Sequence, residues 1–203
     1  TNYQLYLDKL LPGDTLFLSS GIYLGNLPLK NVIGTDSEPI VIKGAADLTI
    51  FQGQSCCNTI SLTKCSYLVI CDLKLNGLNQ FVDAIKAEGT EGNWADHITI
   101  ENISIVNYAF NQQSIGISTK CSAWNWIIRK NRISQCGTGM YLGNSDGTKP
   151  FVNGIIENNL ITGSIGYNIE IKHQLNGVRD DFNGTRVNGF TLIRNNVFSK
   201  DSL

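Results

Sequence analysis

The sequence has no excess of charge of either sign and no long apolar run. Its 16 basic and 17 acidic side chains leave a formal net charge of −1, so neither nucleic acid nor an anionic lipid surface is a favoured partner. The longest apolar runs fall far short of the roughly 20 residues that a membrane-spanning helix needs. No signal peptide opens the chain, which fits a mature terminus as well as an internal starting point, so export stays open. With 203 residues and 42% apolar content, the chain can bury one elongated core.

A hexapeptide pattern recurs along the chain. It reads apolar, any, polar, Asn or apolar, any, apolar, and its copies begin at Ile70, Ile100, Ile128, Ile156 and Ile193. Successive copies start 30, 28, 28 and 37 residues apart. A period in this range indicates one supersecondary unit stacked on itself. Each unit is rich in β-branched residues and Asn and is too short for a pair of helices, so the pattern predicts a solenoid of strands.

Each repeat also contains a second apolar stretch upstream of the hexapeptide. These stretches are residues 60–62, 84–87, 115–118, 139–142 and 169–172, and residues 15–18, 40–42 and 48–51 predict the strands of the first turns. Two or three short strands per turn of roughly 28 residues favour a parallel β-helix. The Leu-x-x-Leu-x-Leu frame and the helical segment of leucine-rich repeats are both missing.

Asparagine occupies the same position in three consecutive hexapeptides, as Asn131, Asn159 and Asn196. Stacked Asn side chains can hydrogen-bond along a ladder and satisfy the backbone of the turn. We therefore predict that these residues have a structural role rather than a role in binding a ligand.

Residues 3–11 predict a short amphipathic helix, which ends at Pro12-Gly13-Asp14. An uncovered first rung would expose apolar interior and unpaired backbone, so we expect this helix to cap the N-terminal end. We predict one all-β domain over residues 1–203, a single-stranded right-handed parallel β-helix of about six to seven turns. No closing element is visible after the last hexapeptide, so we expect that end to stack on further residues or on another chain.

The spacing of the cysteines argues against some disulfides. Thr63-Lys64-Cys65-Ser66 recurs two periods later as Thr119-Lys120-Cys121-Ser122. At roughly 4.8 Å per rung the two sulfur atoms would lie about 10 Å apart, which is too far for a disulfide. We predict that most cysteines are buried thiols, and we leave the redox state of the adjacent Cys56 and Cys57 open.

The chain resembles the right-handed parallel β-helix superfamily, which has the pectin-lyase-like fold. Residues 12–18, 21–23 and 39–44 resemble the N-terminal turn of secreted bacterial members, and residues 166–174 with 193–200 are similar to uncharacterised bacterial β-helix repeat proteins. The resemblance implies a secreted, periplasmic or cell-surface location. It leaves the activity open, because this fold hosts lyases, hydrolases, epimerases, tailspikes and adhesins.

In such a fold we expect function on the longest connections. Measured from the second stretch to the next hexapeptide, the connections from Ile171, Ile85, Leu142 and Ile117 span 22, 15, 14 and 11 residues. The three longest leave the turn at one point and should therefore line one side of the stack. Those after Leu142 and Ile171 belong to neighbouring rungs and should touch.

These connections contain our candidate site residues. The fold's lyases cleave uronate chains by β-elimination, which needs a cation to neutralise the substrate carboxylate and a base to take the adjacent proton. The candidates are Lys172 or His173 as base, Arg179 or Arg186 as carboxylate clamp, Trp94, Asn144, Asp146 and Lys149 for substrate binding, and Glu170, Asp180 and Asp181 as ligands of Ca²⁺. Glu170-Ile171-Lys172 resembles the calcium and base segment of chondroitinase-B-like and alginate lyases, without their second calcium glutamate and with a shorter spacing to Lys.

Three other interpretations remain open from the sequence. A glycoside hydrolase would use paired carboxylates, for which Asp146, Asp180 and Asp181 are candidates. A non-catalytic glycan-binding or adhesive β-helix, from a surface protein or a tailspike, would need no catalytic set. Residues 144–147 and 180–184 also match plain solvated turns. The sequence thus favours a polysaccharide lyase acting on an acidic glycan and leaves open whether the protein is an enzyme.

Overall fold

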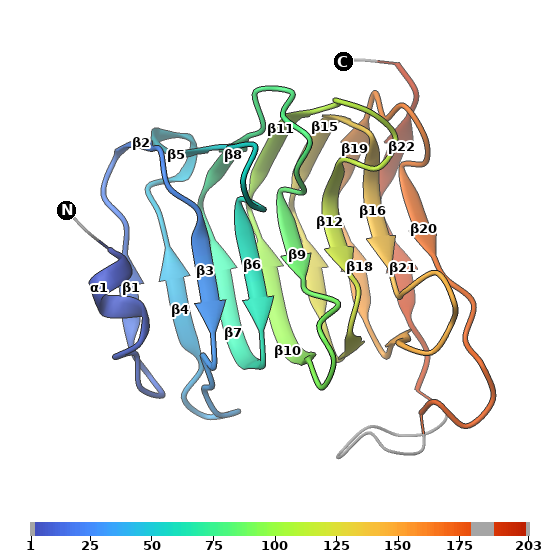
Figure 1. The fold of residues 1–203 in the computed structure, drawn as a ribbon, viewed down its shortest axis with the longest axis horizontal. Helices are drawn as coiled ribbons and strands as arrows, with labels where there is room; N and C mark the ends of the chain where they lie inside the picture. Colours follow the sequence, from blue (N-terminus) through green and yellow to red (C-terminus); the bar gives the residue numbers. More distant parts are fainter. Residues whose placement is uncertain (1–2, 180–188, 202–203) are drawn as a thin grey trace.

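The computed structural model describes residues 3–179 and 189–201. The described chain winds into stacked turns joined by parallel strand pairs, which confirms the predicted parallel β-helix (Figure 1). Each complete turn contributes one strand to each of three parallel sheets. Because the smallest of these sheets has six strands, six turns of the described chain are complete and a seventh is begun.

The strands of the three sheets have the following bounds. The nine-stranded sheet contains β1 (Thr15–Phe17), β4 (Ile40–Lys43), β7 (Cys65–Cys71), β10 (Trp94–Glu101), β14 (Ile127–Arg129), β18 (Ile155–Glu157) and β21 (Leu192–Arg194), with β13 (Ser122–Trp124) and β17 (Phe151–Val152) beside this path. The seven-stranded sheet contains β2 (Gly21–Tyr23), β5 (Thr49–Gln52), β8 (Lys74–Asn76), β11 (Ser104–Tyr108), β15 (Arg132–Cys136), β19 (Leu160–Thr162) and β22 (Val197–Ser199). The six-stranded sheet contains β3 (Leu27–Lys30), β6 (Ile60–Thr63), β9 (Ile85–Ala87), β12 (Ile115–Thr119), β16 (Thr138–Leu142) and β20 (Ile169–Ile171).

The first residue of each hexapeptide lies in one column of the core. Ile70, Ile100, Ile128 and Ile156 pair in register from turn to turn, and all four are fully buried. Each such side chain contributes roughly 1.5–3 kcal/mol by its burial. Ile156 pairs in turn with Ile193, so the longer last interval adds residues to a connection and leaves the strand register intact.

The predicted asparagine ladder is confirmed at the corner between the nine-stranded and seven-stranded sheets. The side-chain nitrogen of Asn131 donates to Asn159 Oδ1 at 3.0 Å, and that of Asn159 donates to Asn196 Oδ1 at 2.9 Å. The same oxygens accept the backbone N–H groups of Asn131 and Asn159. The side chains therefore satisfy backbone donors at a corner where the strand ladder is interrupted.

The residue before each ladder asparagine, and the corresponding Asn102 one turn earlier, has a left-handed backbone conformation. Asn102, Lys130, Asn158 and Asn195 have φ values of 52°, 56°, 56° and 54°. Asn adopts this region more readily than most residues, which explains why Asn-Asn occurs at two of these corners.

The N-terminal helix is shorter than predicted. It spans α1 (Gln4–Leu7) rather than residues 3–11, and a single 3-10 turn, η1 (Ala46–Leu48), is the other helical segment of the described chain. Tyr3 and Leu7 are buried against the first turn, where the Tyr3 ring lies 5.6 Å from the Tyr23 ring. The capping role is thus confirmed. No helix of the described chain is long and apolar enough to cross a membrane.

Four of the six cysteines are free thiols and three of these, Cys65, Cys121 and Cys136, are buried, so the prediction that most cysteines are buried thiols holds for half of them. Cys65 and Cys121 are free and buried, and desolvation raises the pKa of Cys65 to about 11 and that of Cys121 to about 12. Both are therefore protonated and unreactive near neutral pH. Cys56 and Cys57 form a disulfide with each other.

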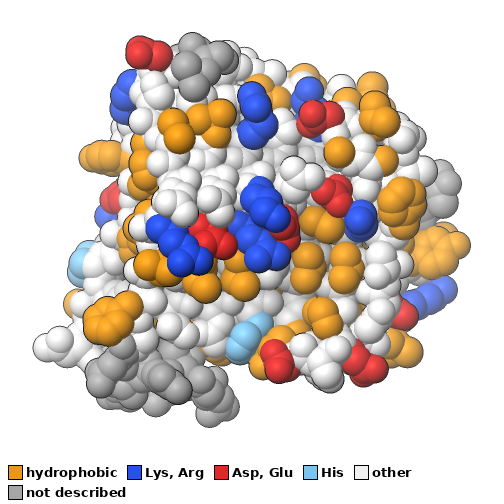
Figure 2. All heavy atoms as spheres, turned by 180° about the vertical axis from the view of Figure 1, so that it is seen from behind, with side chains coloured by type: hydrophobic (Ala, Val, Ile, Leu, Met, Phe, Trp, Pro, Cys, Tyr) orange, Lys and Arg blue, Asp and Glu red, His pale blue; other side chains and the backbone are white. Residues whose placement is uncertain are grey.

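Ion pairs connect successive turns on the face opposite the six-stranded sheet, where Figure 2 shows Lys and Arg side chains interleaved with Asp and Glu. Arg129 Nη2 lies 2.8 Å and Lys130 Nζ 2.9 Å from the Glu101 carboxylate, and Arg194 Nη2 lies 2.7 Å from that of Glu157. Opposite charges thus occupy neighbouring rungs in register. Such pairs stabilise the folded state modestly, because they are solvent-exposed.

The substitution Glu101→Gln tests this ladder. Partial burial raises the pKa of Glu101, but hydrogen bonds from Arg129 and Lys130 outweigh it and lower the pKa. The pair therefore stabilises the fold above the unfolded pKa of about 4.3 and loses this effect as pH falls below it. We expect Glu101→Gln to cost at most about 1 kcal/mol at neutral pH and nearly nothing under strongly acidic conditions. Urea denaturation at both pH values, with the exposed Glu91→Gln as control, checks this, and a loss independent of pH would contradict it.

Candidate functional site

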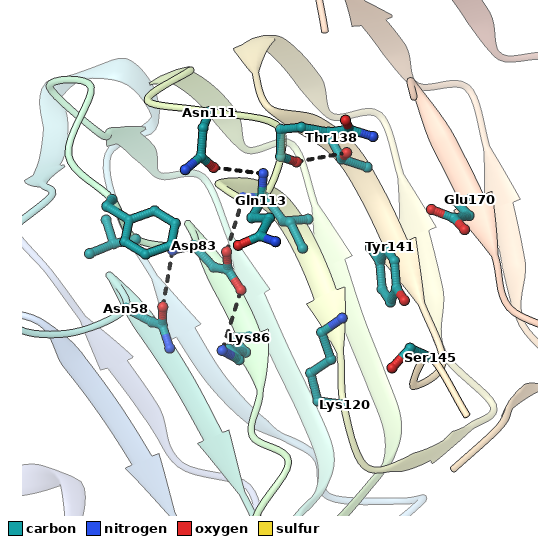
Figure 3. Close-up of a pocket in the computed structure, with 14 residues that line it drawn as sticks. Asn58, Asp83, Lys86, Asn111, Gln113, Lys120, Thr138, Tyr141, Ser145 and Glu170 are labelled. Carbon is teal, nitrogen blue, oxygen red and sulfur yellow. Dashed lines mark hydrogen bonds and ion pairs between the residues drawn. The ribbon is translucent and has the colours of Figure 1, made fainter. Parts of the chain in front are cut away.

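A hollow of ≈ 930 Å³ lies on the outer face of the six-stranded sheet. This volume falls in the range of roughly 300–1,000 Å³ that is usual for ligand sites. Its lining comes from β9, β12, β16 and β20, from the connections that lead into β6, β9 and β12, and from the connections that follow β12 and β16 (Figure 3). The lining residues are Asn58, Phe81, Val82, Asp83, Lys86, Asn111, Gln112, Gln113, Ile115, Lys120, Thr138, Tyr141, Ser145 and Glu170.

One row of side chains runs across the floor of this hollow. Lys86, Ser118, Tyr141 and Glu170 pair in register on four consecutive strands, and all of them except the buried Ser118 line the hollow. Because side chains alternate between the two faces of a strand, neighbours of this row such as Met140 point into the core. Polar groups are thereby presented outward at a spacing of roughly 4.8 Å per rung.

Lys120 follows β12 directly and is half-buried in the hollow. Its ammonium nitrogen lies 3.3 Å from the centroid of the Tyr141 ring, and Figure 3 shows both side chains directed into the same space. Desolvation lowers the pKa of Lys120 to about 8, although the nearby charge of Asp83 acts in the opposite direction. Burial disfavours the charged form of an amine, so a substantial fraction of Lys120 is a neutral base at mildly alkaline pH.

Asp83 anchors the wall beside Lys120. It is buried and accepts hydrogen bonds from Ile115 N–H at 3.0 Å and from Ser118 Oγ at 2.9 Å. Its carboxylate also lies 3.6 Å from Lys86 Nζ. Desolvation raises the pKa of Asp83. Asp83 and Glu88, whose carboxylate lies 4.0 Å from Lys86 Nζ, thus hold the Lys86 ammonium in the floor of the hollow.

Lys172, which the sequence suggested as a base, lies at the edge of the hollow. Its Nζ donates to Glu170 Oε1 at 2.8 Å and lies 5.4 Å from the centroid of the Tyr141 ring. The hydrogen bond from Lys172 to Glu170 raises the pKa of Lys172. This environment favours a charged lysine over a neutral base.

The long connections are arranged as predicted. Those after β9, β16 and β20 leave the same edge of the six-stranded sheet (Figure 1). Leu175 N–H donates to Gly147 O at 3.1 Å, so the two last connections touch. His173 is exposed on this flank. Arg179 does not line the large hollow. Its Nε donates to Gln174 Oε1 at 2.7 Å, and its side chain lines a second, smaller hollow of ≈ 370 Å³.

The large hollow, as lined by the described residues, does not include the residues suggested for substrate binding, which are Trp94, Asn144, Asp146 and Lys149. Asn144 Oδ1 accepts Lys149 N–H at 2.8 Å. Asp146 Oδ1 accepts Thr148 N–H at 2.8 Å, and the hydrogen bonds from Thr148 lower the pKa of Asp146. These contacts close the connection on itself, as the plain-turn interpretation requires. Trp94 packs on the nine-stranded sheet, with its ring centroid 6.3 Å from that of Trp124.

The calcium prediction stays a prediction. Of its three ligands, Glu170 is paired with Lys172, and Asp180 and Asp181 lie outside the described residues, as does the clamp candidate Arg186. Within residues 3–179 and 189–201, no group of three or more His, Cys, Asp or Glu side chains is arranged to hold a metal ion. We therefore derive no step through a metal.

Sequence reasoning missed Lys86, Lys120, Tyr141 and Asp83 because it ranked connections by length. The hollow is instead built mainly from the outer face of the six-stranded sheet and from the connections that enter its strands, with Lys120 and Ser145 added from the edge at which the strands end. The second strands carried a usable signal, since aligning them by repeat places Lys86, Tyr141 and Glu170 in one outward column.

Comparisons with known structures agree with this fold. The chain superposes on an alginate lyase from Paenibacillus sp. str. FPU-7 with a TM-score of 0.68 and 20% identity, covering 98% of this chain and 74% of that one. A PL6 family alginate lyase, AlyGC, gives 0.54 and 16%, covering 78% and 27%. The A-module of the Azotobacter vinelandii mannuronan C-5 epimerase AlgE4 gives 0.52 and 18%, covering 76% and 44%.

These likenesses confirm the parallel β-helix fold that the resemblance implied. The chain spans only about a quarter of the length of AlyGC, 27%, so the likeness concerns one part of that protein. No protein-family model matches the sequence, and none of the curated proteins matches it.

Proposed function

We propose that this protein is a polysaccharide lyase that cleaves a uronate-containing glycan by β-elimination, with Lys120 as the base. The observation that carries the proposal is Lys120 itself, a desolvated amine with a pKa of about 8 in a hollow that also presents the Lys86 ammonium. An amine base and a second cation are what elimination from a uronate requires. The alginate lyases among the structural neighbours support the same class.

The hollow suggests a role for each group in the reaction. The Lys86 ammonium pairs with the uronate carboxylate, which makes the neighbouring C5–H more acidic. The Lys120 amine takes the C5 proton, the electron pair of that bond forms the C4–C5 double bond, and the bond from C4 to the glycosidic oxygen breaks. The departing oxygen needs a proton, for which the Tyr141 hydroxyl is the candidate donor beside Lys120. Because the proposed substrate is a glycan, we also propose that the protein is bacterial and is secreted, periplasmic or located at the cell surface.

The carboxylates of the hollow support hydrolysis less well. Asp83 and Glu170, the two acidic side chains that line it within the described residues, are each engaged by a lysine, at 3.6 Å and 2.8 Å. A glycosidase needs one carboxyl as acid and another free to act as base or nucleophile.

The proposal can be tested by ultraviolet absorbance, because elimination leaves an unsaturated uronate that absorbs ultraviolet light. We expect absorbance to rise when the protein is incubated with alginate, polygalacturonate or another polyuronate, assayed with Ca²⁺ and with a chelator. New reducing ends without this absorbance would establish hydrolysis instead. Binding without either product would establish a glycan-binding module, and the lyase proposal would then be withdrawn.

A further inference from the structure

Two phenylalanine rings lie together at the rim of the hollow. Phe81 and Phe110 are 54% and 60% exposed, and their ring centroids are 5.5 Å apart at an interplanar angle of 38°. Phe81 also lines the hollow. The rings come from the connections β8–β9 and β11–β12, at the edge where the strands of the six-stranded sheet begin.

The position of these rings within the stack is informative. Phe17 and Phe198 are also exposed, but they belong to the first and last turns, where the core meets an end of the stack. Phe81 and Phe110 belong to the third and fourth turns. An exposed ring in these turns lacks the roughly 1.5–3 kcal/mol that its burial would contribute to stability. Proximity to an end of the stack does not explain the exposure of these two rings.

Hydrogen bonds hold the connections that carry the rings. Asn79 N–H donates to Asn107 O at 2.8 Å, and Asn79 Oδ1 accepts Ala109 N–H from the next turn at 3.3 Å. Leu78 and Asn79 both have left-handed backbones, with φ of 50° and 54°. A left-handed Leu is strained, and such strain persists only where the surroundings enforce it. The rings are therefore displayed from a fixed backbone.

From this arrangement we infer that Phe81 and Phe110 form an aromatic platform for a further sugar ring of the uronate chain. The inference rests on the proposed function. The apolar C–H face of a pyranose fits an exposed aromatic ring, while Lys86 and Lys120 in the same hollow meet carboxylates. Apolar walls with a few placed charges are usual for ligand sites. The platform extends the site beyond the reacting residue and selects for longer chains.

Kinetics with alginate fragments of increasing length test the platform, using Phe81→Ala and Phe110→Ala. We expect KM for an octasaccharide to rise roughly three- to tenfold, with a smaller change in kcat. The shortest fragment that is cleaved should show a smaller rise in KM, because it has fewer sugar rings to place on the platform. Phe17→Ala is the matched control, since Phe17 is 59% exposed on β1 and far along the stack. Phe81→Leu retains apolar contact without a ring and should behave as Phe81→Ala does.

A binding measurement separates this inference from the proposed function. Calorimetric titration of octasaccharide into Lys120→Ala protein, with and without Phe81→Ala, should show the same loss of affinity without turnover. If the wild-type protein cleaves alginate and the platform variants match it, the platform is wrong and the lyase stands. An equal effect of Phe17→Ala would also overturn the platform. If the wild-type protein neither cleaves nor binds any polyuronate, both proposals fail.

Discussion

Replacing Lys120 by Ala is expected to lower kcat on a polyuronate substrate by roughly 10²–10⁴-fold, the usual contribution of a positioned general base. The amine is half-buried beside Tyr141, and its removal takes away the group with the lowered pKa. The release of unsaturated uronate measures the effect. An unchanged melting temperature would show that the variant is folded.

The pH profile distinguishes a base from a bound cation. Because the neutral amine is the active form, kcat/KM of the wild-type protein should rise as pH increases through the Lys120 pKa of about 8. Lys120→Arg retains the positive charge but cannot lose a proton near that pH. We expect it to be as inactive as Lys120→Ala. An active Lys120→Arg variant would assign Lys120 to carboxylate binding.

Lys172→Ala is the matched comparison, since sequence reasoning placed the base at Lys172 or His173. Lys172 is held by Glu170, which raises its pKa, and we expect its loss to impair the reaction far less than the loss of Lys120. If activity survives Lys120→Ala and disappears in Lys172→Ala, the base returns to Lys172.

Replacing Asn159 by Ala is expected to destabilise the fold by about 3 kcal/mol or more. Asn159 Oδ1 accepts both the backbone and the side-chain N–H of Asn131 at 3.0 Å, and its own side chain donates to Ile128 O at 2.9 Å. The substitution leaves these buried donors and acceptors without a hydrogen-bond partner, and each unsatisfied group lowers the free energy of unfolding by roughly 1–3 kcal/mol. Urea denaturation measures the change, and the melting temperature should fall by roughly 6–12 °C.

Asn158→Gly is the control for the ladder, because Asn158 precedes Asn159 and is exposed. Its φ of 56° suits glycine, and its backbone N–H bond to Arg194 O would remain. We expect this variant to stay within about 1 kcal/mol of the wild-type protein. A similar loss in both variants would show that the corner, rather than the side-chain ladder, carries the stability.

Strand prediction succeeded where the repeat was regular and failed where it was not. The hexapeptides that begin in β7, β10, β14, β18 and β21 all form strands that pair with their own copies, as predicted. The short strands β2, β3, β13 and β17 contain no copy of the pattern and were not predicted. In β3, Pro28 is tolerated because its strand lies at the edge of the sheet.

The sequence by itself determined the stacking unit, the core column and the asparagine ladder, because each depends on residues that recur at one period and pair with their own copies. The tertiary structure decided where the candidate site lies. The Lys120 pKa depends on the burial of its amine and on Asp83, a side chain 37 positions earlier in the chain. Desolvation and charge act through space, so no spacing along the chain reports them until the turns are stacked.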